Sequence, residues 1–264
     1  MHLRHVLLIF LLVVPSAWAG SQSQAEALHE PEKIIKFAKD VEKYAASKGA
    51  RAFIIARVGR PEKDLPKGIK FTHTALAIYS NIELTNGEVL QGYAIHNLYQ
   101  LNGQADKSEL VVDYPIDFFW GAQELTAGVL IPSIELQQKL IELIASGNDK
   151  LLHNNNYSVI ANPFNNQFQN CTEYTLDLIN AAIYQTLDME QLKVNAQAHF
   201  KPQKLSTSRF KLMFGSMLMD DVTTKDHKGK VYTATFSSLG RYLQSNQLSD
   251  DFVTFQANGE VTAL

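Results

Sequence analysis

Cysteine is almost absent from this sequence, because Cys171 is the only one among 264 residues. A chain with one cysteine cannot form an internal disulfide, so a disulfide-stapled scaffold is excluded. In an exported chain, a leftover cysteine points to a partner chain or to a reactive thiol. The alternative is a buried thiol that serves as a small apolar side chain. Which of these applies depends on the residues around Cys171.

Strongly basic stretches and long apolar runs are also missing. The chain is 45% hydrophobic and 19% charged, with a formal net charge of −3, which is ordinary for a globular protein. Without a basic patch, we expect no nucleic-acid partner. The sequence has no phosphate-binding loop, no dinucleotide fingerprint and no metal-ligand cluster, so we expect no cofactor and no metal.

The first residues have the pattern of a secretory signal. Arg4 lies in a short cationic start, and Val6–Val14 is an apolar run that is too short to span a bilayer. Ala17-Trp18-Ala19 then supplies small residues for cleavage. We therefore expect residues 1–19 to be removed and the protein to be secreted across the inner membrane into the periplasm. The alternative is an uncleaved membrane anchor.

We expect a monomer, with at most a peripheral association with the cell envelope.

The remaining residues alternate between helical and extended patterns. Apolar residues at helical spacing predict helices over 31–47, 133–146, 174–184, 189–198, 206–219 and 237–244. Runs of β-branched and aromatic residues predict strands over 51–58, 69–79, 89–98, 109–112 and 251–256. Asn86-Gly87 predicts a hairpin between two of these strands. We expect an α+β fold with a core over 20–185, which includes the N-terminal helix, and a C-terminal extension over 186–264 packed on that core.

Cys171 lies between a polar loop and an apolar run. Asn162–Asn170 is rich in turn-forming residues, and Tyr174–Tyr184 is compatible with a helix. A thiol in the first turn of a helix lies near the positive end of the helix dipole and near backbone N–H groups. Both lower the pKa of the thiol and favour the thiolate, which is the nucleophilic form. We therefore predict that Cys171 is the attacking atom of a hydrolase or acyltransferase.

Two of the eight histidines are candidates for the base that such a nucleophile needs. His73 and His96 each lie inside an apolar predicted strand, where a histidine is costly unless it is hydrogen-bonded or functional. Taken singly, each is more often a satisfied structural histidine. Two of them on neighbouring strands, together with a cysteine at a helix start, form a candidate site.

Three short motifs resemble a known superfamily. Phe71-Thr-His73-Thr-Ala-Leu-Ala-Ile-Tyr79 resembles the histidine-bearing strand of the NlpC-type papain-like cysteine hydrolases. Tyr93-Ala-Ile-His96 is similar to their next strand, which carries a third polar group. Asn170-Cys171-Thr-Glu is similar to the start of the nucleophile helix in the circularly permuted branch, where the histidine precedes the cysteine. The chain most resembles a bacterial family called a domain of unknown function, number 2145, over roughly residues 50–185.

The resemblance implies a role for each of these residues. Cys171 is expected to be the nucleophile, His73 the base and His96 the residue that orients the imidazole. Asn97 competes with His96, because adjacent strand residues face opposite sides and only one of them can point at His73. The implied fold is a circularly permuted papain-like one, in which an antiparallel sheet packs against the helix that carries the nucleophile.

The expected reaction is the hydrolysis of an amide bond, in a peptide or a cell-wall peptide, through a thioester at Cys171. The backbone N–H of Cys171 is one expected oxyanion donor, and Gln169, Asn170 and Tyr157 are candidates for a second. Two alternatives stay open. The same thiol could serve an acyltransferase or lipid hydrolase, or the chain could be an inactive binding module on the same scaffold.

Overall fold

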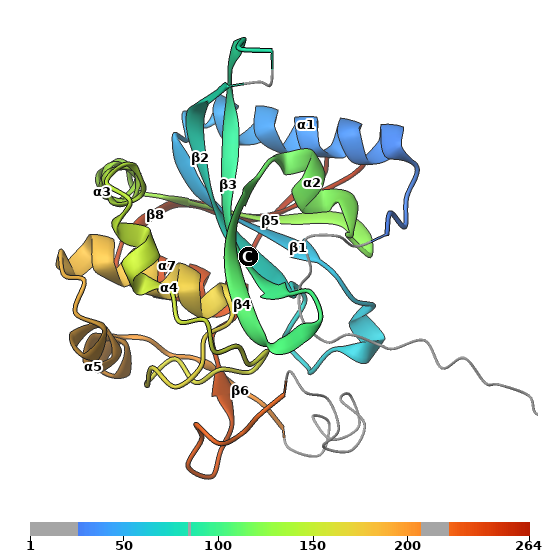
Figure 1. The fold of residues 1–264 in the computed structure, drawn as a ribbon. Helices are drawn as coiled ribbons and strands as arrows, with labels where there is room; N and C mark the ends of the chain where they lie inside the picture. Colours follow the sequence, from blue (N-terminus) through green and yellow to red (C-terminus); the bar gives the residue numbers. More distant parts are fainter. Residues whose placement is uncertain (1–25, 84–85, 207–221) are drawn as a thin grey trace, which may run out of the picture.

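A computed structural model describes residues 26–83, 86–206 and 222–264 (Figure 1). The predicted signal over 1–19 and nearly all of the predicted helix over 206–219 lie outside these residues. None of the helices in the described ranges is long and apolar enough to cross a membrane.

A seven-stranded sheet forms the centre of the molecule, and all of its neighbouring strands pair antiparallel. The strand order is β4-β3-β2-β1-β5-β8-β9. The strands are β1 (Ala52–Val58), β2 (His73–Glu83), β3 (Val89–Leu101), β4 (Gln104–Asp113), β5 (Glu124–Pro132), β8 (Ser249–Gln256) and β9 (Val261–Ala263). The short strands β6 (Gln203–Lys204) and β7 (Tyr232–Thr233) form a separate antiparallel pair.

Helices cover both faces of this sheet, and six of them lie in the described residues. They are α1 (Pro31–Ser47), α2 (Pro115–Trp120), α3 (Ile134–Ala145), α4 (Cys171–Tyr184), α5 (Met189–His199) and α7 (Phe236–Ser245). One buried cluster joins α1 and α2 to one face of the sheet, and a second joins α3, α4, α5 and α7 to the other. All seven residues of β1 are buried, as expected for a strand covered on both sides. The predicted α+β class with an antiparallel sheet is confirmed.

The C-terminal residues belong to the central sheet. Strand β8 pairs with β5 over seven residue pairs, and helix α7 packs against both strands. The boundary expected at residue 185 therefore divides residues that share one sheet and one buried core.

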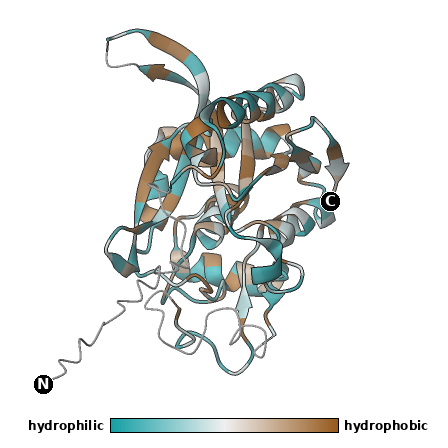
Figure 2. Ribbon diagram, turned by 90° about the vertical axis from the view of Figure 1, so that its right-hand side faces the viewer, coloured by the Kyte–Doolittle hydropathy of each residue, from teal (hydrophilic) through white to brown (hydrophobic). Residues whose placement is uncertain are grey.

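Strands β2 and β3 form the hairpin predicted from Asn86-Gly87, but it is longer than predicted. Pairing continues to Glu83 and Val89, and Gly87 has a φ of +82°, which favours glycine at this turn. The end of the hairpin projects from the rest of the molecule (Figure 2). The base of the hairpin is covered by helices, so the buried residues lie in the first part of β2 and in the later part of β3.

Strand β5 was not among the predicted strands, and Gly128 is one reason. Glycine weakens the sequence pattern of a strand. In the structure, a Cβ atom at this position would overlap the aromatic ring of Phe236, the first residue of α7. Gly128 thus lets α7 approach the sheet closely.

We expect Gly128→Ala to destabilise the fold by about 1–3 kcal/mol, because the added methyl group must displace the Phe236 ring. Urea denaturation of the variant and the parent protein measures this loss. In a Phe236→Leu background the same substitution should have a smaller effect. Equal losses in both backgrounds would contradict the assignment of the strain to this contact.

Candidate active site

Cys171 begins helix α4. The side chain of Asn170 caps this helix, with Oδ1 accepting a hydrogen bond of 2.9 Å from the backbone N–H of Glu173. This cap explains why the helix begins three residues earlier than the apolar pattern alone predicted. Helix α4 is buried on nearly every side, and Cys171 itself is 4% exposed.

The start of α4 contacts the start of β2. The Cys171 Sγ lies 4.0 Å from the backbone oxygen of Thr72, and the Thr172 hydroxyl lies 3.3 Å from that of Thr74. Thr72 and Thr74 flank His73, the first residue of β2. The fold therefore brings the cysteine and the histidine, 98 positions apart in the chain, to neighbouring places at one end of the sheet.

His73 is held by a hydrogen bond and by two aromatic rings. Its Nε2 lies 2.9 Å from Asn97 Oδ1. The imidazole stacks on the Tyr99 ring, with centroids 4.7 Å apart and planes 15° apart, and it also contacts Phe118. His73 is 1% exposed. Its orientation is therefore fixed by groups that are themselves part of the core.

The hydrogen bonds of Asn97 determine which ring nitrogen of His73 carries the proton. The Asn97 Nδ2 donates to Asp113 Oδ1 at 2.6 Å and to the backbone oxygen of Ile95 at 3.1 Å. Both of those partners accept, so Oδ1 is the atom that faces His73 and Nε2 must be the donor. In the neutral ring, Nδ1 then carries the lone pair. This nitrogen is buried and has no hydrogen-bond partner among the described residues.

The third group beside His73 is Asn97 rather than His96. His96 faces the opposite side of β3, where it pairs in register with Leu76 and lies near Asp149. The first choice from the sequence is corrected here: the structure does not bring His96 to the His73 ring. The reason is the alternation of a β-strand, which lets only one of two adjacent residues face a given side.

Burial makes His73 a neutral imidazole near pH 7. The pKa of His73 is lowered well below its ordinary value, mainly by burial and then by the positive charge of Arg57, while the hydrogen bond to Asn97 opposes this. Burial also raises the pKa of Asp113 to about 7, although hydrogen bonds from Tyr99 and Asn97 and the charge of Arg57 lower it. A neutral imidazole can accept a proton, as a general base must.

Two of the three candidates for a second oxyanion donor make structural hydrogen bonds. Gln169 is fully buried, and its amide bonds to the backbone oxygen of Leu152, the backbone N–H of Asn154 and the Asp177 carboxylate. Asn170 caps α4 and donates to the backbone oxygen of Val159. Tyr157 lines the same pocket as Cys171 and stays a candidate.

A pocket opens beside Cys171. Its described lining comes from the loop before β2, the loop that contains residues 157–160, the start of α4, and residues near β6 and β7. No group of three or more His, Cys, Asp or Glu side chains in the described ranges is arranged to hold a metal ion.

Comparison with protein-family models places the chain in an uncharacterised family. Residues 44–243 match the model of a family described as "Uncharacterized protein conserved in bacteria (DUF2145)". The chain belongs to this family. No curated protein and no solved structure matches the chain. The family match begins within α1, covers the rest of the predicted core, and ends within helix α7, before strand β8.

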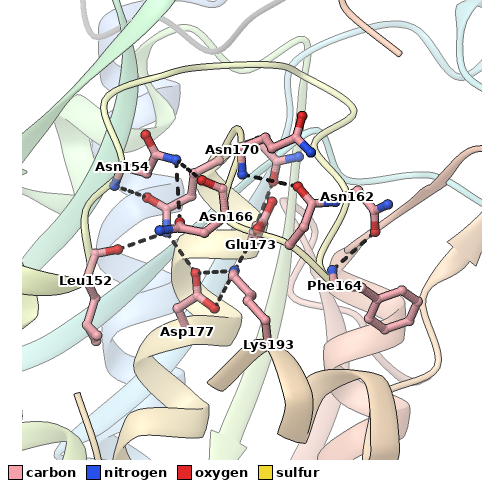
Figure 3. A network of polar contacts seen from close by, with 12 residues as sticks. Leu152, Asn154, Asn162, Phe164, Asn166, Asn170, Glu173, Asp177 and Lys193 are labelled. Atoms are coloured by element: carbon pink, nitrogen blue, oxygen red, sulfur yellow. Dashed lines mark hydrogen bonds and ion pairs between the residues drawn. The ribbon is translucent and has the colours of Figure 1, made fainter. Parts of the chain in front are cut away.

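A buried ion cluster fixes the first two turns of α4 within this family member. The Lys193 Nζ, from α5, lies 2.7 Å from Glu173 Oε1 and 2.8 Å from Asp177 Oδ1 (Figure 3). The pKa of Glu173 is raised well above its ordinary value by burial, and the attraction of Lys193 opposes this rise. Sequence reasoning missed this cluster, although two acids four residues apart in an apolar helix were a visible signal.

We expect Lys193→Met to destabilise the protein by about 3–5 kcal/mol, since it leaves two buried carboxyl groups without their cation. Without this cation, the two carboxyl groups bind protons more tightly in the folded state. The loss of stability should therefore be larger at about pH 8 than at about pH 5. Urea denaturation at both pH values measures it. Lys139→Met removes an exposed ion pair with Glu135 and serves as the control, with a loss below about 1 kcal/mol. A loss for Lys193→Met no larger than for this control would contradict the role of the cluster.

Asp113→Asn tests the half-buried acid that bonds to Asn97. With a folded pKa near 7 and an ordinary value of 3.8, Asp113 binds its proton more tightly in the folded state. It therefore makes folding less favourable as the pH rises from about 4 to about 7. Both proteins keep His73, whose lowered pKa acts in the opposite direction, so the comparison isolates Asp113. We expect the stability of the variant relative to the parent to increase over this range in urea denaturation.

The matched control for this experiment is Asp250→Asn, because Asp250 is an exposed aspartate on β8 and is not among the charges that shift the pKa of Asp113. Its stability relative to the parent should change little with pH. If the stability difference between Asp113→Asn and the parent is also independent of pH, the Asp113 carboxyl is ionised throughout this range in the folded protein.

Proposed function

We propose that this protein is an exported cysteine hydrolase that cleaves an amide bond, with Cys171 as nucleophile, His73 as base and Asn97 as the residue that orients the imidazole. The observation that carries the proposal is the state of His73. Its Nε2 is bound to Asn97, its Nδ1 is unpartnered among the described residues, and its chain neighbours contact the start of α4. A nucleophile, a base and an orienter are the parts that this chemistry needs.

The first half of the reaction forms a thioester. The thiol proton of Cys171 passes to Nδ1 of His73 while the sulfur attacks the carbonyl carbon of the substrate. The carbonyl electrons move to oxygen, and the backbone N–H of Cys171 is the proposed donor to this oxyanion. When the carbonyl re-forms, the C–N bond breaks and His73 gives its proton to the leaving amine.

The second half consumes water. His73 accepts a proton from water, the oxygen attacks the thioester carbonyl, and the C–S bond breaks to release a carboxylic acid. The proton then returns to the sulfur. Because Asn97 holds Nε2–H in one direction throughout, the same nitrogen, Nδ1, serves as acceptor and donor in both halves.

The lowered pKa of His73 defines how the proposed enzyme responds to acid. Activity is lost when Nδ1 is protonated. Burial lowers the pKa of His73, so this protonation occurs at a lower pH than for an ordinary histidine. The acid limb of kcat/KM is therefore expected below about pH 6.5.

The wider assignment is also part of the proposal. The order of histidine before cysteine, and the packing of a central sheet against the nucleophile helix, fit a circularly permuted NlpC-type papain-like fold. The apolar start of the chain supports export to the periplasm, where peptides and cell-wall peptides are available substrates.

Alkylation of Cys171 by iodoacetamide, followed by mass spectrometry, tests the catalytic assignment. We expect His73→Ala to slow alkylation at about pH 7 by roughly 100-fold, in line with the loss of a positioned base. Asn97→Ala should slow it to a smaller extent. His96→Ala is the matched control, because it removes a neighbouring histidine from the other face of β3, and its rate should stay close to that of the parent.

Two outcomes would overturn the assignment. If His73→Ala reacts as fast as the parent protein, His73 does not activate the thiol, and a binding module becomes the better reading. If His96→Ala and Asn97→Ala exchange their expected effects, the third residue is His96 despite its position. Circular dichroism of each variant separates these results from unfolding.

A further inference from the structure

The pocket beside Cys171 is mostly apolar. Its wall includes six aliphatic or aromatic side chains from separate parts of the chain, namely Leu65, Ile69, Phe71, Val159, Ile160 and Leu205. Phe71 is fixed by edge-to-face packing on Phe236, with ring centroids 4.9 Å apart. Ile160 and Leu205 belong to a small buried cluster of their own. The wall is therefore anchored in packed structure on several sides.

The polar groups of this wall already have partners inside the protein. The Thr72 hydroxyl accepts a hydrogen bond from the backbone N–H of Gly59 at 2.9 Å. The Thr172 hydroxyl is bound to that of Thr74, and Asn170 donates to the Thr233 hydroxyl at 3.3 Å. A ligand that enters the pocket would have to compete with these bonds to satisfy a polar group of its own.

Charge in the described wall is limited to one residue. Arg60 is its only ionisable side chain apart from Cys171 and Tyr157, and no Asp or Glu of the described ranges lines the pocket. An amine that left water for this wall would lose hydration with no carboxylate beside it, and a carboxylate would have Arg60 as the one cation of the described wall, so neither would recover its full hydration. An apolar group would instead gain about 25 cal/mol for each Å² that it buries.

We propose that this pocket binds an apolar group carried next to the scissile carbonyl, and that it thereby selects substrates with a leucine-like or phenylalanine-like group there over substrates with a charged one. This inference rests on the proposed function, because it uses Cys171 as the attacking atom. It narrows the substrate from any amide to one flanked by an apolar group. Peptides with a carboxylate or an amine at this position are disfavoured.

Matched covalent probes test the selection on the mature full-length protein. Each probe is a peptidyl acyloxymethyl ketone, and the set differs only in the residue next to the ketone, which is leucine, phenylalanine, glutamate or lysine. The Cys171 sulfur attacks the methylene carbon, a C–S bond forms, the carboxylate leaves, and His73 takes the thiol proton. We expect the leucine and phenylalanine probes to label Cys171 at least about 10-fold faster than the glutamate and lysine probes.

A pocket variant and a matched control test whether the pocket causes the preference for apolar probes. Ile69→Lys places a cation in the wall, so the rate of the leucine probe relative to the glutamate probe should fall by about 10-fold. Ile134→Lys makes the same change at an isoleucine that is 79% exposed and outside the pocket, and it should leave this ratio unchanged. If Ile69→Lys fails to fold, the four probes on the parent protein decide the question alone.

The apolar group could come from a peptide side chain or from an acyl chain, so a fifth probe carries an octanoyl group on the same ketone. Faster labelling by this probe supports the apolar pocket and assigns it to an acyl chain. Equal labelling by leucine and glutamate probes, with dependence on His73 intact, overturns the inference and leaves the proposed function standing. Labelling that is equal in the parent and in His73→Ala overturns the proposed function itself.

Discussion

The start of helix α4 is held against the start of strand β2, and the candidate site depends on this junction. Thr72 and Thr74 contact Cys171 and Thr172 across it. The junction is rigid because each side is fixed independently. The Asn170 cap and the buried Lys193 cluster fix the helix, while β2 lies between two neighbouring strands. The backbones that carry Cys171 and His73 are thus fixed on the two sides of one junction.

The two faces of the sheet contribute different parts of the site. The face covered by α1 and α2 supplies the surroundings of His73, including Tyr99, Phe118 and the Asn97–Asp113 pair. The other face supplies α4 and the apolar pocket. Because β2 begins at His73, its ring lies at the end of the sheet, where groups from both layers can meet. The sheet is therefore a scaffold for the site as well as the centre of the core.

Buried polar groups are costly, and several of them lie on the elements that carry the proposed chemistry. His73, Glu173, Asp177 and Lys193 are buried, and Asp113 is half-buried. A buried ion pair contributes little net stability when compared with well-packed apolar residues. We infer that these groups orient the elements of the site, since each of their bonds restricts a loop or a helix start. The C-terminal residues share in this role, because Lys193, β8 and α7 complete the core on which α4 rests.

Local pattern alone determined a large part of this picture. The single cysteine, the polar loop before it and the apolar run after it placed Cys171 at a helix start. Periodicity predicted the α+β class and helix α3, and Asn86-Gly87 predicted the β2–β3 hairpin. These features depend on residues close together in the chain, whose spacing follows from 3.6 residues per helical turn and two per strand repeat.

Tertiary structure decided the rest. The choice of Asn97 over His96 depends on which face of β3 meets His73, and the roles of Asp113 and Lys193 depend on contacts with residues 16 to 20 positions away. Strand β5 escaped prediction because Gly128 serves the packing of α7 rather than the strand itself. Such features follow from register and close packing between distant segments, and no pattern within a single segment encodes them.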